Sequence, residues 1–244
     1  MKRIALVLAT LLAVLAGCDG DSNKLVVAVD ATYQPFEFYD ENHEIAGFEI
    51  DLCREVAKRA GYEVEFVNQP WDGIIPGLQS KKYDLIFSSM TITEERSREL
   101  LFSEPYYDAG QVIAGREDQQ GIETLDHLEG KKIGAQRGTT GAIKAHEVQG
   151  AEVKEYDSID LAFLDLKNGS IDAVINDEPA SRALVQAKGG AKLVGVPLTD
   201  EKYGIAFRKE DGELAKKFNA ALAEVKKDGT YEKLRKKWLE GKAE

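Results

Sequence analysis

The chain has 244 residues, with 43 Asp and Glu against 32 Lys and Arg, which gives a formal net charge of −11. Such acidity disfavours a general nucleic-acid binder, because nucleic acids are bound through basic surfaces. With 43% hydrophobic and 31% charged residues the chain can bury a core, and this composition excludes a disordered, collagen-like or multispan membrane protein.

The first 17 residues differ in composition from the rest and have the pattern of an export signal. Lys2 and Arg3 precede the apolar run 4–15, and two small residues follow it. At about 1.5 Å per residue, this run is too short to cross a hydrocarbon core of roughly 30 Å. We therefore predict that residues 1–17 form a signal peptide that is cleaved.

The residues around the first cysteine resemble the bacterial lipobox. In that motif, which here reads Leu15-Ala16-Gly17-Cys18, the cysteine is lipidated and becomes the new amino terminus. The resemblance implies a lipid anchor at Cys18, with residues 18–23 as a tether. A plain secretory signal followed by a chance cysteine is the alternative.

Thiol and imidazole groups give no sign of a disulfide or a metal site. If Cys18 is acylated, the only other thiol is Cys53, so no intramolecular disulfide can form. We expect Cys53 to pack as a small apolar side chain in a helix. The histidines His43, His127 and His146 lack metal-ligand spacing, and we predict neither a metal nor a cofactor.

After the tether, strand and helix patterns alternate. The apolar run 25–29 is typical of a strand buried on both faces. Apolar residues at intervals of four predict a helix over 48–60, which Gly61 ends. The next elements complete a βαβαβ lobe: strand 64–67, helix 73–78 and strand 84–87.

A second stretch repeats this alternation without sequence repetition, and Pro179 falls where proline favours a first helical turn. Two helices, 214–225 and 231–239, then follow, separated by a turn at Asp228-Gly229. Two α/β lobes with a cleft between them are therefore expected. The elements of the second lobe are strands 132–135, 153–156, 171–175 and 193–196, and helices 140–147 and 159–166.

Motifs of nucleophilic catalysis and nucleotide binding are missing from the sequence. The glycine-rich stretch 134–141 runs from a strand into a helix, where its N–H groups could cradle an anion or simply form a turn. In the comparable turn 88–96, Thr93 can cap a helix. Arg96 then lies in the first helical turn, against the helix dipole, so we expect an anionic partner for it. A solvated surface arginine is the alternative.

Six segments in both lobes resemble the polar amino-acid binding proteins of ABC importers: 30–38, 47–52, 90–96, 102–107, 165–174 and 228–231. The resemblance covers about residues 24–241. It implies the type II periplasmic-binding-protein fold, an α/β protein of two lobes, each a mostly parallel sheet flanked by helices. Two hinge strands would lie near 107–111 and 201–204. Lobe 1 would comprise 24–108 and 203–244, and lobe 2 would comprise 109–202.

The resemblance also implies roles for the residues that would hold a zwitterion. Arg96 would grip the ligand α-carboxylate, helped by the N–H groups of Thr91 and Thr140. Asp177 would receive the α-ammonium together with Ser89 and the Thr91 hydroxyl, and a helix N-cap is the alternative for this aspartate. Because Arg96 and Asp177 lie on opposite lobes, a bound zwitterion would stabilise closure.

For the ligand side chain, Tyr33 and Trp71 correspond to aromatic walls, although Trp71 could instead be a core aromatic. Asp30 corresponds to a carboxylate at the ligand tip, and Glu37 is either a second one or faces solvent. Gln136 takes a position where relatives carry lysine or leucine, and glutamine keeps a cationic ligand possible. The predicted ligand-binding set is Asp30, Tyr33, Glu37, Trp71, Ser88, Ser89, Thr91, Arg96, Gln136, Thr140 and Asp177.

The sequence therefore predicts a monomeric, lipid-anchored solute-binding protein, without enzymatic activity, on the periplasmic or extracytoplasmic face of the cytoplasmic membrane. It would deliver a cationic amino acid, arginine first and lysine or ornithine next, to an ABC permease, and it would bind no nucleic acid. Aromatic walls suit a planar guanidinium. Alternatives are a glutamine or broad polar amino-acid binder, and a receptor sensory domain, which the lack of a C-terminal transmembrane segment disfavours. A cyclohexadienyl dehydratase-like enzyme would need a general acid such as Glu178 or Glu37.

Overall fold

The computed structural model describes residues 23–240. The predicted signal peptide, the lipidation site Cys18 and most of the predicted tether lie outside this range. None of the helices in this part of the chain combines the length and the hydrophobicity that a membrane span needs.

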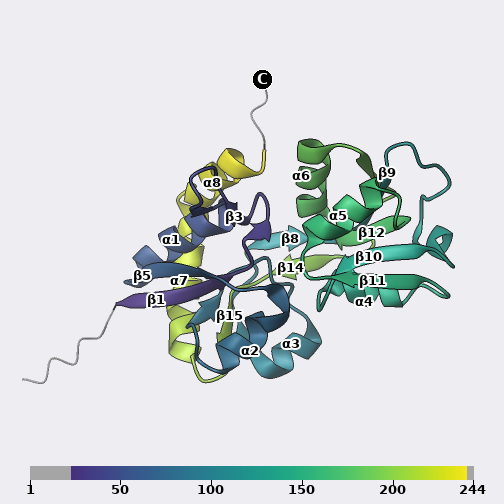
Figure 1. Cartoon of the computed structure of the whole chain (residues 1–244). Helices are drawn as coiled ribbons and strands as arrows, with labels where there is room; N and C mark the ends of the chain where they lie inside the picture. The colour runs from purple at the N-terminus through teal and green to yellow at the C-terminus, as the bar shows by residue number, and fades with distance from the viewer. Residues whose placement is uncertain (1–22, 241–244) are drawn as a thin grey trace, which may run out of the picture.

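Two five-stranded sheets organise the molecule, one in each of two lobes (Figure 1). The strands of the first sheet are, in order, β5 (Glu63–Asn68), β1 (Lys24–Val29), β6 (Leu85–Ile86), β15 (Ala206–Arg208) and β7 (Leu100–Phe102). Strand β1 pairs in parallel with β5 and β6, whereas β15 runs antiparallel to β6 and β7. The carboxyl ends of three neighbouring strands therefore meet at one edge of this sheet.

The second sheet has the same plan. Its order is β11 (Glu152–Tyr156), β10 (Lys132–Gln136), β12 (Ala173–Asp177), β9 (Gln111–Arg116) and β13 (Ala191–Val194). Strand β10 is parallel to β11 and β12, and β9 is antiparallel to β12 and β13. The prediction of a two-lobed α/β fold is confirmed.

Helices flank both sheets. The first lobe has α1 (Phe48–Ala60), the short 3-10 turn η1 (Trp71–Gly73), α2 (Ile74–Gln79), α3 (Glu94–Glu99), α7 (Gly212–Lys227) and α8 (Thr230–Trp238). The second has η2 (Leu125–Leu128), α4 (Thr140–His146), α5 (Ile159–Lys167) and α6 (Glu178–Lys188). Helices α7 and α8 pack against α1, so the last described helices belong to the first lobe (Figure 1).

Helix α1 shows why the sequence pattern was informative. Phe48, Leu52 and Val56 recur at helical spacing and are fully buried, and the helix ends at Gly61, whose φ of 88° is favourable only for glycine. Cys53 lies on the same buried side and is free. Burial raises the pKa of its thiol, and the prediction that Cys53 packs as a small apolar side chain is confirmed.

Two short strands connect the lobes. Strands β8 (Tyr107–Ala109) and β14 (Glu201–Tyr203) pair antiparallel and lie between the lobes (Figure 1). A separate three-stranded sheet is formed by β2 (Thr32–Tyr33), β3 (Glu37–Tyr39) and β4 (Ile45–Ala46). It lies just after β1 in the chain and turns residues 32–39 back towards the first sheet.

Two strands of the second lobe differ from their predicted positions. The strand predicted at 171–175 is β12 at Ala173–Asp177, because the turn at Gly169, with φ 74°, continues to Asp172. The Asp172 carboxylate holds this turn by accepting the Lys132 N–H at 2.9 Å. The strand predicted at 193–196 is β13, which ends before Gly195, where φ is 73°. The first shift places Asp177 at the carboxyl end of a strand, on the edge of the sheet.

Candidate functional site

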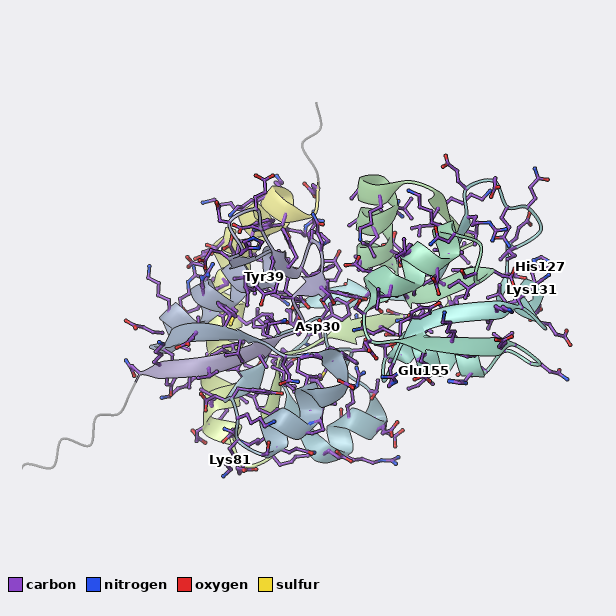
Figure 2. The ribbon with its side chains drawn as sticks, viewed as in Figure 1. Asp30, Tyr39, Lys81, His127, Lys131 and Glu155 are labelled. Atoms are coloured by element: carbon purple, nitrogen blue, oxygen red, sulfur yellow. The ribbon has the colours of Figure 1, made fainter. Side chains whose placement is uncertain are left out.

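A pocket lies in the cleft between the two lobes. The space inside it, counted together with its open mouth, is about 330 Å³. Figure 2 shows Asp30 on the side of the first lobe that faces the second. The lining consists of Asp30, Tyr33, Glu37, Trp71, Ser88, Ser89, Thr91, Arg96, Gln136, Thr139, Thr140 and Asp177.

Every residue of the predicted ligand-binding set lines this pocket, and Thr139 joins them. Thr139 caps α4: its hydroxyl accepts the Ala142 N–H at 3.2 Å and donates to the Gln136 carbonyl at 2.7 Å. A threonine just before a helical pattern indicates an N-cap in the sequence alone. The pocket forms here because most of the residues that line it lie at or after the carboxyl ends of parallel strands in both sheets, while Tyr33 and Glu37 come from the small β2–β3–β4 sheet.

Arg96 lies in the cleft at the start of α3. Thr93 caps this helix, and its hydroxyl accepts the Arg96 N–H at 3.1 Å, which confirms the predicted cap. The guanidinium donates to the carbonyl oxygens of Thr91 at 2.9 Å and Gly138 at 3.2 Å. It also lies 5.3 Å from the ring centroid of Trp71. The alternative of a solvated surface arginine is therefore wrong, and both hydrogen-bond partners of the guanidinium are neutral.

Asp177 is 8% exposed and lies across the cleft from Arg96, in the second lobe. Its carboxylate accepts hydrogen bonds from the Tyr33 hydroxyl and the Gln111 amide. Although Asp177 occupies the N-cap position of α6, its side chain makes no capping bond, so the N-cap alternative is wrong for the carboxylate. Burial raises the pKa of Asp177 to about 6, and the negative charge of Glu201 adds to this effect.

At another part of the pocket, Asp30 follows β1. Its carboxylate accepts the Thr32 hydroxyl at 2.9 Å and the Gln136 amide at 2.8 Å. Burial raises the pKa of Asp30. Gln136 belongs to the second lobe and also donates to the Asp157 carbonyl at 3.2 Å, so the Asp30–Gln136 bond connects the two lobes.

Glu37 is 1% exposed, and the alternative in which it faces solvent is wrong. The small β2–β3–β4 sheet turns its carboxyl group inward, where it accepts the Ser88 hydroxyl at 2.8 Å. Burial, followed by repulsion from Glu49, raises the pKa of Glu37 well above its ordinary value. The second carboxyl oxygen of Glu37 is buried and receives no hydrogen bond from a donor.

Glu49 on α1 was missed in the sequence and is fully buried behind the pocket. It accepts the N–H and the hydroxyl of Ser89 and the hydroxyl of Tyr106, each at 2.8 Å. These bonds hold Ser89 at a φ of 43°, which is unfavourable for a non-glycine residue. Burial raises the pKa of Glu49 as well, while the hydrogen bonds from Ser89 and Tyr106 oppose the rise.

Two polar residues of the hinge region also reach the site. Gln111 begins β9 and is buried, with its amide nitrogen 3.0 Å from the Thr140 hydroxyl and 3.3 Å from the Glu201 carboxylate. Glu201 begins the hinge strand β14. Both residues belong to the predicted hinge strands 107–111 and 201–204, but neither was predicted to take part in the site. Within residues 23–240, no group of three or more His, Cys, Asp and Glu residues could hold a metal ion.

A polar cleft pocket between two α/β lobes, with an arginine on one lobe and a buried aspartate on the other, is the arrangement of a two-lobed solute-binding protein. The sequence model of bacterial extracellular solute-binding proteins, family 3, matches residues 25–241. The chain belongs to this family.

Curated relatives cover nearly the whole chain. The chain is 40% identical to the ABC transporter arginine-binding protein 1 of Escherichia coli, over 98% of this chain and 99% of the relative. It is 38% identical to the histidine-binding periplasmic protein of Salmonella typhimurium, over 98% of each. It is 36% identical to the lysine/arginine/ornithine-binding periplasmic protein of E. coli, over 88% of this chain and 86% of the relative.

Solved structures give the same family. An ancestral arginine-binding protein bound to arginine matches with a TM-score of 0.85 and 45% identity, over 88% of this chain and 98% of the other. An ancestral arginine-binding protein bound to glutamine matches with a TM-score of 0.82 and 44% identity, over 88% of this chain and 97% of the other. An ancestral amino-acid-binding protein is described as a precursor of cyclohexadienyl dehydratase. It matches with a TM-score of 0.84 and 40% identity, over 89% of this chain and 96% of the other.

Proposed function

We propose that this protein captures a cationic amino acid, with arginine favoured over lysine and ornithine, and delivers it to an ABC permease. The observation that carries this proposal is the charge of the pocket lining. Arg96 is its only basic residue, against the acids Asp30, Glu37 and Asp177. A zwitterion neutralises Arg96 and Asp177, and the carboxylate of Asp30 is then left for a cationic side chain.

The α-carboxylate of the ligand would bind to the Arg96 guanidinium. Thr140 opens α4, so its N–H has no acceptor within the helix and is available to the same carboxylate. The α-ammonium would bind to Asp177, whose present hydrogen-bond partners, Tyr33 and Gln111, are neutral. Because the two charges of the ligand are held by opposite lobes, binding favours closure.

The ligand side chain would extend towards Asp30. A guanidinium donates to carboxylates in pairs, and Asp30 is buried with a raised pKa, so a cation there stabilises its ionised form. Gln136 adds no charge. Glutamine, the alternative ligand, would leave the buried carboxylate without a counter-ion, which costs about 1 to 3 kcal/mol.

The dehydratase alternative would require a general acid over a leaving hydroxyl. Glu178 does not line the pocket and forms an ion pair with Arg182. Glu37 does line it, but its carboxyl group is buried and accepts the Ser88 hydroxyl. We therefore propose binding without catalysis, and an assay with prephenate and arogenate tests this directly, because turnover of either substrate would contradict it.

For the location, we propose that residues 1–17 are removed and that Cys18 is lipidated, which anchors the protein to the extracytoplasmic face of the cytoplasmic membrane. The moving units would be 24–108 with 203–244, and 109–202, in a monomer. Membrane fractionation of the full-length protein and of Cys18→Ser tests the anchor. The variant should be soluble or unprocessed, and unchanged fractionation would contradict lipidation.

The ligand is tested by calorimetry with arginine, lysine, ornithine, histidine and glutamine, preceded by a thermal-shift screen. A ligand at one hundred times its dissociation constant adds about 2.7 kcal/mol of stability. We expect the tightest binding for arginine and at least about tenfold weaker binding for glutamine. If no amino acid shifts the melting temperature, the proposed function is overturned. If glutamine binds more tightly than arginine, the assignment of arginine as the ligand is overturned.

A further inference from the structure

The hinge carboxylate of Glu201 does not line the ligand pocket, but it contacts residues that do. Its Oε2 atom accepts the hydroxyl of Thr91 and the hydroxyl of Thr140, both at 2.8 Å. Its Oε1 atom accepts the Thr199 hydroxyl at 2.9 Å. Thr91 follows the first sheet and Thr140 begins α4 in the second lobe, so one carboxylate oxygen connects both lobes from the hinge.

A hydroxyl group has one hydrogen to donate and two lone pairs that accept. Because the Thr91 hydroxyl gives its hydrogen to Glu201, only its lone pairs remain for a molecule in the pocket. Lone pairs bind an ammonium group, which only donates, and they repel a carboxylate. The direction of this one hydrogen bond therefore decides which end of an amino acid can lie against the Thr91 hydroxyl.

The Thr91 hydroxyl donates because an ionised carboxylate only accepts, and the Thr140 hydroxyl is oriented in the same way. The Gln111 amide lies 3.0 Å from the Thr140 hydroxyl oxygen, to which it donates, and Thr140 in turn donates to Glu201. Gln111 also donates to Asp177, the carboxylate proposed to receive the ammonium. The acceptors that face the cleft are thus ordered by one network that runs from the hinge through Gln111 to the second lobe.

We propose that Glu201 is a positioning residue that orients the Thr91 hydroxyl to accept the α-ammonium of the bound amino acid. This inference rests on the proposed function and deepens it, because it assigns to the hinge a part in recognising the ligand. Glu201 itself does not touch the ligand. Its effect reaches the ligand through Thr91.

The competing explanation is simple repulsion. The negative charge of Glu201 is close enough to act on Arg96 and Asp177, so it would also disfavour a ligand carboxylate on Arg96. The two explanations predict opposite effects of removing Glu201 on amino-acid affinity. Removal of Glu201 weakens amino-acid binding if the residue orients Thr91, and strengthens it if the residue only repels the carboxylate.

The test is a double-mutant cycle of Glu201→Ala and Thr91→Val, with arginine affinity measured by calorimetry. We expect each single variant to bind arginine about tenfold more weakly, as for the loss of one hydrogen bond to a charged group. The double variant should bind no more weakly than Thr91→Val alone, because both changes remove the same interaction. If Glu201→Ala does not fold, as judged by circular dichroism, Glu201→Leu, which also lacks an acceptor, replaces it in the cycle.

Two controls separate the orienting role from a structural one. Asp200→Ala removes a neighbouring acid that is exposed, and it should leave the arginine affinity unchanged. The ligand 5-guanidinopentanoate, which is arginine without its α-amino group, should bind equally to the wild type and to Glu201→Ala. A merely structural role for Glu201 would weaken both ligands alike.

Unchanged or tighter arginine binding by Glu201→Ala, or additive losses in the cycle, would overturn this proposal. The proposed function would then still stand if Asp177→Asn loses arginine binding. A wild-type protein that binds no amino acid would overturn the proposed function and this inference together.

Discussion

The two ends of the pocket are built differently. At the end of Arg96 and Asp177, two groups of opposite charge lie on opposite lobes, and neutral partners hold each of them. At the end of Asp30 and Glu37, the Ser88 hydroxyl accepts the Asp30 N–H and donates to the Glu37 carboxyl group, and the basic residue of the pocket lining, Arg96, belongs to the other end. The first end fits what every amino acid has in common. The second end fits only some side chains, so selectivity is decided there.

The largest effects are expected from the end that all amino acids share. Arg96→Ala and Asp177→Ala should each weaken binding of arginine and of glutamine by about 2 to 5 kcal/mol, because loss of one partner strands a desolvated charge on the ligand. Calorimetry with both ligands measures this, and Asp200→Ala serves as a surface control. Either variant binding both ligands within threefold of the wild type would contradict the assignment of this end.

Asp177 should also reduce the stability of the empty protein. Its folded pKa of about 6 lies above the ordinary value of 3.8, so as the pH rises from 4 to 7 the unfolded chain loses this proton first and the folded state loses stability. Asp177→Asn should therefore stabilise the ligand-free protein by about 2 to 3 kcal/mol at pH 7.

Urea unfolding of the ligand-free wild type and of Asp177→Asn, at pH 7 and at pH 4, measures this difference. The gain should shrink towards pH 4, where the wild-type carboxyl is protonated in the folded state. An equal gain at both pH values would show that the charge of Asp177 is not its cause.

Some of this site could be predicted from the sequence and some could not, for physical reasons. Arg96 and Asp30 stand in the segments 90–96 and 30–38 that carry the family resemblance, and each comes after a strand that the apolar pattern predicts. Asp177 lies just beyond such a segment, in a strand whose end was predicted two residues too early. Glu49 lies in an amphipathic helix, where one buried acid among apolar residues gives no signal until its partner Ser89 is known. Glu201 contacts Thr91, which is 110 positions away in the chain, and only the crossing of the hinge strands brings the two together.

At the selective end, Asp30→Asn should change the preference between ligands rather than the binding of all of them. The binding free energy of arginine should weaken by about 1 to 3 kcal/mol, because its guanidinium loses a carboxylate partner. Glutamine should bind with nearly the same or higher affinity, since the variant no longer has a buried charge without a counter-ion. Calorimetry gives the ratio of the two affinities. If the ratio stays at its wild-type value, Asp30 does not select the ligand.

The smallest effect concerns Trp71, which was predicted to stack on the ligand side chain. Its ring instead lies against the Arg96 guanidinium, and its indole N–H donates to the Gly138 carbonyl at 3.1 Å, across the cleft. These contacts associate Trp71 with the shared end. Trp71→Phe keeps a ring for the guanidinium of Arg96 but loses the bond between the lobes, which is worth about 0.5 to 1.5 kcal/mol.

Arginine and glutamine should therefore both bind about threefold to tenfold more weakly to Trp71→Phe. If Trp71 is a wall for the ligand guanidinium, Trp71→Leu should weaken arginine alone, since a cation–π contact requires both the ring and a cationic ligand. Equal losses for the two ligands in both variants would assign Trp71 to closure of the lobes. A loss confined to arginine would assign Trp71 to the selective end, as the aromatic wall for the ligand side chain that the sequence predicted.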